Sequence, residues 1–133
     1  MSVLKCDRQE SPVQFIDTAM KLLEHTIKYT RKQFNNKDYD LVRRIRDLSI
    51  DILNNVVMAN AIFPKSQNDI DRRYEHFRTA KSSCFALMTL ISTIKNVVHS
   101  TVTSYGWLMW GTYLKEEINL INKVIASDKK LTF

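Results

Sequence analysis

Glycine and proline are scarce in this sequence, which has only two of each among its 133 residues. An all-β fold needs many turn residues, and alternating strands and helices need a break between successive elements, so both classes are excluded. The composition, with 44% hydrophobic and 26% charged residues, is that of an ordinary globular domain. A chain of this length forms one domain, so we predict a single all-α unit built from a few long helices.

Cysteine is equally scarce, and long apolar runs are absent. Cys84 falls on a predicted core face and Cys6 in a predicted N-terminal tail, so the two do not form a disulfide framework. No apolar run approaches the roughly 20 residues that cross a bilayer, and no leader with a basic and then an apolar part opens the chain. We therefore expect a cytoplasmic protein that has no membrane partner.

The sequence also lacks the constellations that catalysis needs. Its histidines and cysteines show no spacing typical of metal ligands, and its glycines are too few for a phosphate-binding loop. Arg72 and His76 resemble the Arg/His pair of small helical ribonucleases, the HEPN domains, but that family separates the two by a longer interval. A surface histidine beside Glu75 is the simpler interpretation. We predict no enzymatic activity, no metal, no cofactor and no small-molecule substrate.

Apolar residues recur at helical spacing in four segments. The four predicted helices cover residues 11–34, 41–60, 69–98 and 104–127. Ser11 supplies a capping hydroxyl to the first helix and Pro12 its first position, while Thr103 or Ser104 caps the last. Short connections favour antiparallel neighbours. The predicted architecture is an up-down-up-down four-helix bundle over residues 11–127, with flexible tails at 1–10 and 128–133.

The predicted helices carry more apolar surface than one small bundle can bury. In the first helix the predicted core row is Ile16, Met20, Leu23, Ile27 and Phe34, and a second apolar row runs beside it. In the second helix the predicted core row is Leu41, Ile45, Leu48, Ile52, Val56 and Ala59, and the additional row lies about 110° or more round the cylinder from it. Such rows call for a subunit interface, so we predict a ring or barrel homo-oligomer. The predicted interface residues are Phe15, Leu22, Tyr29, Ile50, Leu53, Val57, Leu90, Val97, Trp107 and Trp110.

Two tryptophans and a glycine open the fourth predicted helix. Trp107 and Trp110 are of the residue type that stacks on bases, but their helical spacing among aliphatic residues favours packing or subunit contact. Gly111 is predicted to let a neighbouring backbone approach closely, at a cost of about 1 kcal/mol relative to alanine.

Positive charge is concentrated in one part of the chain. The net charge is +6, and the stretch from Lys21 to Arg46 holds eight basic residues against three acidic ones. A concentrated positive field neutralises several phosphates together, so the stretch predicts binding to nucleic acid. The alternative is a basic face that only contacts solvent. The candidate contacts are Lys21, Lys28, Arg31, Lys32, Arg43, Arg44, Arg46, Arg72, Arg73 and Arg78.

Three segments carry a resemblance to a known family: DLVRRIRDLSIDILNNVVMAN, RRYEHFRTAKSSCFALMTLIST and LKEEINLINKVI. Over residues 13–126 the chain resembles the small four-helix-bundle family of the rRNA intervening-sequence proteins. Within that family it is most similar to the accessory variability determinants (Avd) of diversity-generating retroelements. Intervening-sequence proteins tend to have an acidic residue and a glycine where this chain has Asn60 and Ala61, which favours the retroelement branch.

The resemblance implies specific binding partners that the residues alone do not predict. It implies a barrel-like homo-pentamer without enzymatic activity, which associates with a reverse transcriptase and its template RNA to support mutagenic synthesis of complementary DNA. Some of the candidate cations would then meet an acidic surface of the polymerase. Two alternatives stay open: a ribosome- or rRNA-associated RNA-binding protein without a polymerase partner, and an adaptor that contacts only proteins.

Overall fold

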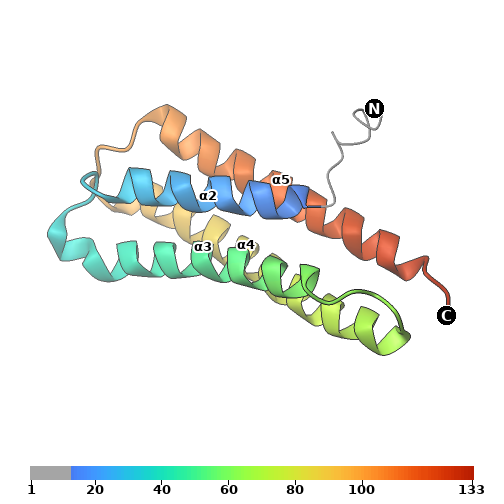
Figure 1. Cartoon of the computed structure of the whole chain (residues 1–133). Helices are drawn as coiled ribbons and strands as arrows, with labels where there is room; N and C mark the ends of the chain where they lie inside the picture. Colours follow the sequence, from blue (N-terminus) through green and yellow to red (C-terminus); the bar gives the residue numbers. More distant parts are fainter. Residues whose placement is uncertain (1–12) are drawn as a thin grey trace, which may run out of the picture.

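The computed structural model describes residues 13–133, which form four helices and their connections (Figure 1). The helices are α2 (Gln14–Thr30), α3 (Tyr39–Asn60), α4 (Gln67–Val97) and α5 (Ser104–Lys129). The chain reverses direction at each connection, each helix packs against its neighbours in sequence, and α2 also packs against α5. The predicted four-helix bundle is confirmed, whereas its assembly into a homo-oligomer stays a prediction.

Local capping signals set the starts of two helices. The hydroxyl of Thr103 accepts a hydrogen bond from the amide of Gly106 at 3.0 Å, which confirms the predicted cap of α5. At α4 the cap is Ser66, whose hydroxyl accepts from the amide of Asp69 at 3.2 Å, so this helix starts two residues earlier than predicted. Ser11, Pro12 and the predicted tail at 1–10, Cys6 included, lie outside the described residues.

The end of α5 differs from the sequence-based prediction. The polar run after 127 predicts a tail, yet the helix continues to Lys129. The reason is a tertiary contact: Asp128 is buried, and its carboxylate accepts two hydrogen bonds from the guanidinium of Arg73 on α4. This pairing holds the last turn of α5 against α4, so the boundary predicted at 127 is wrong.

A single hydrophobic core runs along the bundle axis. On α3 the predicted core row is confirmed, with only Leu41 at its start half-buried. On α4 the buried residues step by three and four along the helix, which keeps them on one face. The buried apolar residues of these two helices are Ile45, Leu48, Ile52, Val56, Ala59, Ile70, Phe77, Ala80, Cys84, Leu87, Ile91 and Ile94.

The two apolar rows of α2 exchange their predicted roles. Phe15 and Leu22, predicted at a subunit interface, are buried in the core of this chain, whereas Met20 of the predicted core row is 45% exposed. The buried row includes threonines that satisfy their own hydroxyls: Thr26 donates to the carbonyl of Leu22 at 2.8 Å, and Thr30 donates to that of Thr26 at 2.6 Å. Because these groups are satisfied locally, the more polar row can be buried at little cost.

Aromatic side chains join α2 to the start of α5. Trp110 is fully buried and its indole N–H donates to the hydroxyl of Thr26 at 2.9 Å, so its predicted place at a subunit interface is wrong. Trp107 is half-buried beside it, with 5.4 Å between ring centroids. The buried imidazole of His25 is 2.8 Å from the carbonyl oxygen of Gly106 through Nε2, and burial lowers the pKa of this histidine.

Close packing at α5 involves a different glycine from the one predicted. A methyl group added at Gly106 would lie 2.8 Å from the ring of Tyr29 and 2.9 Å from Val102. At Gly111, by contrast, nothing lies within 4 Å of such a group. The prediction for Gly111 is therefore wrong, and Gly106 is the position where α2 and α5 need the absence of a side chain.

The two ends of the bundle hold different connections. At one end the α2–α3 turn contacts the α4–α5 connection: the amide of Thr101 donates to the carbonyl of Gln33 at 2.8 Å, and Phe34 forms an antiparallel bridge with Ser100. The opposite end holds the α3–α4 loop, the start of α2 and the end of α5 (Figure 1).

Candidate nucleic-acid interface

Six of the ten predicted contacts gather where α2 ends and α3 begins. We call this region the basic end, and it consists of Lys28, Arg31, Lys32, Arg43, Arg44 and Arg46. The α2–α3 turn joins the two groups, so residues far from the core in both helices are brought to one end of the bundle (Figure 1). Backbone contacts join this turn to the α4–α5 connection, and they fix the backbone from which those side chains extend.

The cations of the basic end are open to solvent. All six are exposed except Arg46, which is half-buried because its Nε donates to the hydroxyl of Thr30 at 2.8 Å. Throughout residues 13–133, no ion pair closer than 4.0 Å involves any of them. Their charge is thus not neutralised by neighbouring carboxylates and remains available to an external anion.

These cations surround the end of the bundle and do not lie in one plane. The bond from Arg46 to Thr30 points its side chain toward α2. Arg44 lies about three turns before Asn55, which puts the two on the same side of α3, and the side-chain oxygen of Asn55 is 3.4 Å from Nδ1 of His76 on α4. Arg44 therefore faces the α4 side, and a bound polyanion would have to follow a curved surface to reach all of them.

The last turns of α2 form a shallow hollow of about 420 Å³ within the basic end. Its lining residues are Glu24, Ile27, Lys28, Arg31, Lys32 and Gln33. Three cations against one carboxylate give this hollow a net positive charge, which suits a phosphate group. Lys21 is two turns before Lys28 on the same side of α2, exposed, and extends the basic row toward the middle of the helix.

Arg73, another predicted contact, is buried in the bundle. Its Nε and Nη2 donate to the carboxylate of Asp128 at 2.8 and 3.2 Å, and its Nη1 donates to the carbonyls of Ala59 and Ile62 at 3.2 and 2.9 Å. Only 7% of the residue is exposed, so its prediction as a phosphate contact is wrong. We call Arg73 and Asp128 the clasp, because they join α4, the end of α3 and the end of α5.

The two other arginines of α4 are exposed, and each pairs with a carboxylate on its own helix. Arg72 pairs with Asp69 at 3.4 Å and Arg78 with Glu75 at 2.8 Å, each one turn along the same helix. Helix α4 enters the bundle beside the clasp, so its first turns sit at the opposite end from the α2–α3 turn. The charge of these arginines is locally balanced, and the expectation that they extend the basic surface stays a prediction.

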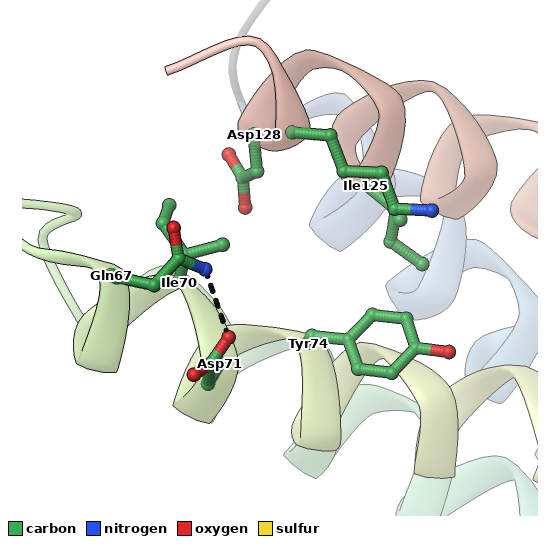
Figure 2. Close-up of a pocket in the computed structure, with 7 residues that line it drawn as sticks. Gln67, Ile70, Asp71, Tyr74, Ile125 and Asp128 are labelled. Atoms are coloured by element: carbon green, nitrogen blue, oxygen red, sulfur yellow. Dashed lines mark hydrogen bonds between the residues drawn. The ribbon is translucent and has the colours of Figure 1, made fainter. Parts of the chain in front are cut away.

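Near the clasp there is a small pocket of about 190 Å³ between the start of α4 and the end of α5 (Figure 2). Ile70, Tyr74 and Ile125 form its apolar wall, and Gln67 donates to the carboxylate of Asp71 at 3.0 Å across its rim. The volume is below the roughly 300–1,000 Å³ of typical small-molecule sites. Nearby, His76 and Arg72 contact different partners, Asn55 and Asp69.

An apolar strip lies along the outside of α2 and α3. The bond between Thr30 and Arg46 sets the register: two turns back along α2 is Leu23, and two turns forward along α3 is Leu53. Beside this pair, Met20, Ile50 and Val57 are between 41% and 45% exposed. We call this the α2–α3 strip, and it consists of Ile16, Met20, Leu23, Ile27, Ile50, Leu53 and Val57.

The remaining predicted interface residues are scattered. Val97 is 74% exposed at the end of α4, and Leu90 is half-buried two turns before it. Tyr29 is half-buried against the core and touches the His25 ring, with 4.6 Å between centroids. Sequence patterns alone missed Met20 and its row as surface residues, because both apolar rows of α2 repeat at helical spacing.

Glu117 is an unusual group in the core of the described part of the chain. It is fully buried on α5, and neither carboxyl oxygen has a hydrogen-bond partner within residues 13–133. Burial, with a smaller contribution from the charge of Glu116, raises its pKa to about 9, so it is a neutral acid at pH 7. The pKa of the buried Cys84 thiol is raised as well, first by burial and then by Glu117. A neutral acid and an un-ionised thiol are poor nucleophiles.

Within residues 13–133, no three His, Cys, Asp or Glu side chains come together as metal ligands would, and no helix there has an apolar stretch that would span a bilayer. None of the known protein-family models matches the chain, and no curated protein matches it.

Proposed function

We propose that this protein is a non-catalytic accessory factor of a diversity-generating retroelement, which binds template RNA and the reverse transcriptase to support mutagenic synthesis of complementary DNA. The observation that carries the RNA part is the basic end, where six cations without carboxylate partners meet at one end of a rigid bundle. The polymerase partner is supported by the resemblance of the three sequence segments. The same basic end would serve an rRNA-associated protein, the alternative.

Binding by the basic end would be electrostatic. Lysine and arginine contacts to phosphates release condensed counterions, so the logarithm of affinity falls with the logarithm of salt by about 0.7 per phosphate on a single strand. Phosphate contacts position a nucleic acid without reading its bases. We therefore expect strong salt dependence and weak sequence preference from the isolated protein.

Charge reversal at each end of the bundle tests the RNA proposal. Arg43→Glu with Arg44→Glu changes the basic end, and Arg72→Glu with Arg78→Glu makes the same change in net charge on α4, outside the basic end. We expect the first pair to lower affinity for an RNA oligonucleotide by at least about tenfold and the second by only a few-fold. Equal losses, or no loss with the first pair, would contradict a localised RNA site.

Assembly into a homo-oligomer, a pentamer by the resemblance, would bury the α2–α3 strip. Exposed apolar surface of this kind marks protein contacts. Met20→Glu with Ile50→Glu should lower the mass measured by light scattering, whereas Phe85→Glu, at a residue that is 52% exposed on α4, should not. A monomer mass for the wild-type chain would defeat this part of the proposal.

The polymerase partner is tested by co-expression. If a reverse transcriptase is encoded beside this protein, the two should co-purify in high salt, where bridging by RNA is weak. Failure to co-purify with that polymerase, together with recovery of rRNA from cells, would favour the rRNA-associated alternative. Recovery of proteins but no RNA would favour an adaptor role.

A further inference from the structure

Two tyrosines at the basic end have most of their surface open to solvent. Tyr39 is the first residue of α3 and Tyr105 the second residue of α5, and each is 61% exposed. Both helices begin at the end of the bundle that holds the α2–α3 turn (Figure 1). Neither ring belongs to the buried core, so packing does not explain why two tyrosines lie at the basic end.

Tyr39 belongs to the same surface as the arginines of α3. Arg43 is one turn further along the helix and Arg46 two turns, so the ring and the two guanidinium groups follow one side of α3. The bond between Arg46 and Thr30 shows that this side borders α2. Tyr39 therefore lies on the side of α3 that carries Arg43 and Arg46 and borders α2.

Tyr105 lies on α5, the helix that packs against α2 on the side away from α3. It immediately precedes Gly106, whose carbonyl oxygen is 2.8 Å from Nε2 of His25 and whose Cα approaches the ring of Tyr29. The end of α2 thus runs between the two tyrosine-bearing helices, and it carries Lys28 and the hollow of about 420 Å³. An extended chain that crosses this hollow would have an aromatic ring at each side and cations in between.

Aromatic rings flanked by cations suit unpaired bases. Each base of a single strand exposes a π-face that stacks on an aromatic ring, whereas the bases of a duplex are already stacked on each other. A surface that bound only phosphates would need no exposed rings. Phe63, 70% exposed at the opposite end, has one cation nearby, with Nζ of Lys65 at 5.9 Å from its ring centroid, and serves as a comparison.

We propose that the basic end is a site for single-stranded RNA, in which phosphates contact the cations of α2 and α3 while unpaired bases stack on Tyr39 and Tyr105. The proposal rests on RNA binding by the basic end and adds a substrate class to it. Stacking confers a preference for single strands over duplexes, which phosphate contacts alone do not supply.

The test compares three probes of about 12 nucleotides, a length within the range bound by single-strand sites. They are an unstructured RNA, an abasic strand with the same phosphates and a duplex RNA. The wild-type protein should bind the unstructured RNA about tenfold more tightly than the abasic strand, since stacking on two rings is lost. Tyr39→Ala should lose about half of this preference on a logarithmic scale, since one of two rings is removed, while its affinity for the abasic strand stays unchanged.

Further variants separate stacking from folding. Tyr39→Phe keeps a π-face and should bind as the wild type does, Tyr105→Ala should show a loss like that of Tyr39→Ala, and Phe63→Ala should show none. Thermal unfolding should be unchanged in all four, because each ring is exposed.

The possible results distinguish a failure of the stacking proposal from a failure of RNA binding by the basic end. If the wild-type protein binds the RNA and the abasic strand equally, or if Tyr39→Ala and Tyr105→Ala bind RNA as the wild type does, stacking is overturned and phosphate binding stands. If none of the probes binds in a salt-dependent way, RNA binding by the basic end fails and the stacking proposal fails with it.

Discussion

The two ends of the bundle use the same residue type in opposite ways. At the basic end, arginines on α3 face solvent without a carboxylate partner. At the other end, the three arginines near the start of α4 each have an acidic partner, and Arg73 forms the clasp with Asp128. An arginine can therefore be a potential ligand for phosphate or a structural tie, and what decides is whether the fold brings a carboxylate to it.

Local charge balance follows from this difference. The first turns of α4 contain acidic residues at helical spacing from their arginines, such as Asp69 before Arg72 and Glu75 before Arg78. The corresponding part of α3 has Asp40 and Asp47, neither of which forms an ion pair within the described structure.

The largest effect is expected at the clasp. Arg73→Met leaves the buried carboxylate of Asp128 without its partner, which should cost about 3–5 kcal/mol of unfolding free energy in urea denaturation. The double variant Arg73→Met with Asp128→Leu removes both charges and should recover most of the loss. RNA affinity of the folded protein should not change. A cost below about 1 kcal/mol for the single variant would show that the clasp is not a structural tie.

The second effect concerns the core between the two ends. The ordinary pKa of Glu117 is 4.5 and burial raises it to about 9, so between these values the folded state holds a proton that the unfolded state releases. Stability from this group is fully present below pH 4.5 and is lost as pH rises toward about 9. The advantage of Glu117→Gln over the wild type should grow by about 1 kcal/mol per pH unit between pH 5 and 8.

The control for Glu117 is its exposed neighbour. Glu116→Gln removes a carboxylate from the surface of α5 and should leave the pH dependence of unfolding nearly unchanged. If Glu117→Gln has the same pH profile as the wild type, the carboxyl group is not neutral in the folded protein.

A smaller effect is expected from packing at the basic end. Gly106→Ala places a methyl group 2.8 Å from the ring of Tyr29 and should destabilise the fold by about 1–3 kcal/mol. Gly111→Ala meets nothing within 4 Å and should stabilise it by up to about 1 kcal/mol through helix propensity. Thermal unfolding of both variants measures the difference, and equal shifts would contradict the close approach at Gly106.

The smallest effect is expected from the exposed pairs on α4. Arg72→Ala and Arg78→Ala each remove a solvent-exposed ion pair, which should leave the unfolding free energy nearly unchanged in urea denaturation. If either variant cost as much stability as Arg73→Met, solvent exposure of the ion pair would not explain the different effects of the three arginines.

Much of the fold could be predicted from the pattern of apolar residues. On α3 the predicted row from Ile45 to Ala59 is the buried row, and it is the longer of the two apolar rows of that helix. On α2 both rows are apolar, and the structure buries the one that contains threonines and His25. Spacing alone could not choose between them, since the hydrogen bonds that satisfy those polar groups come from the fold.

The candidate site was predicted in part for a similar reason. Counting cations found the basic end, but it could not separate Arg73 from Arg72. The signal was nevertheless in the register: Ile70, Arg73 and Phe77 follow the steps of three and four that mark the buried face of α4. Glu117 occupies the same kind of step on α5, between Leu114 and Ile121. A charged residue in register with the core predicts burial, whereas its partner depends on tertiary structure.

The backbone bonds between the α2–α3 turn and the α4–α5 connection have a thermodynamic consequence. Because Gln33 and Thr101 are already joined, and Phe34 is paired with Ser100, the loops beside the cations lose little conformational freedom when a ligand arrives. The entropic penalty of association falls mainly on long side chains and on the ligand. Hydrogen exchange at the amide of Thr101 should accordingly be slow in the free protein and stay so after RNA is added.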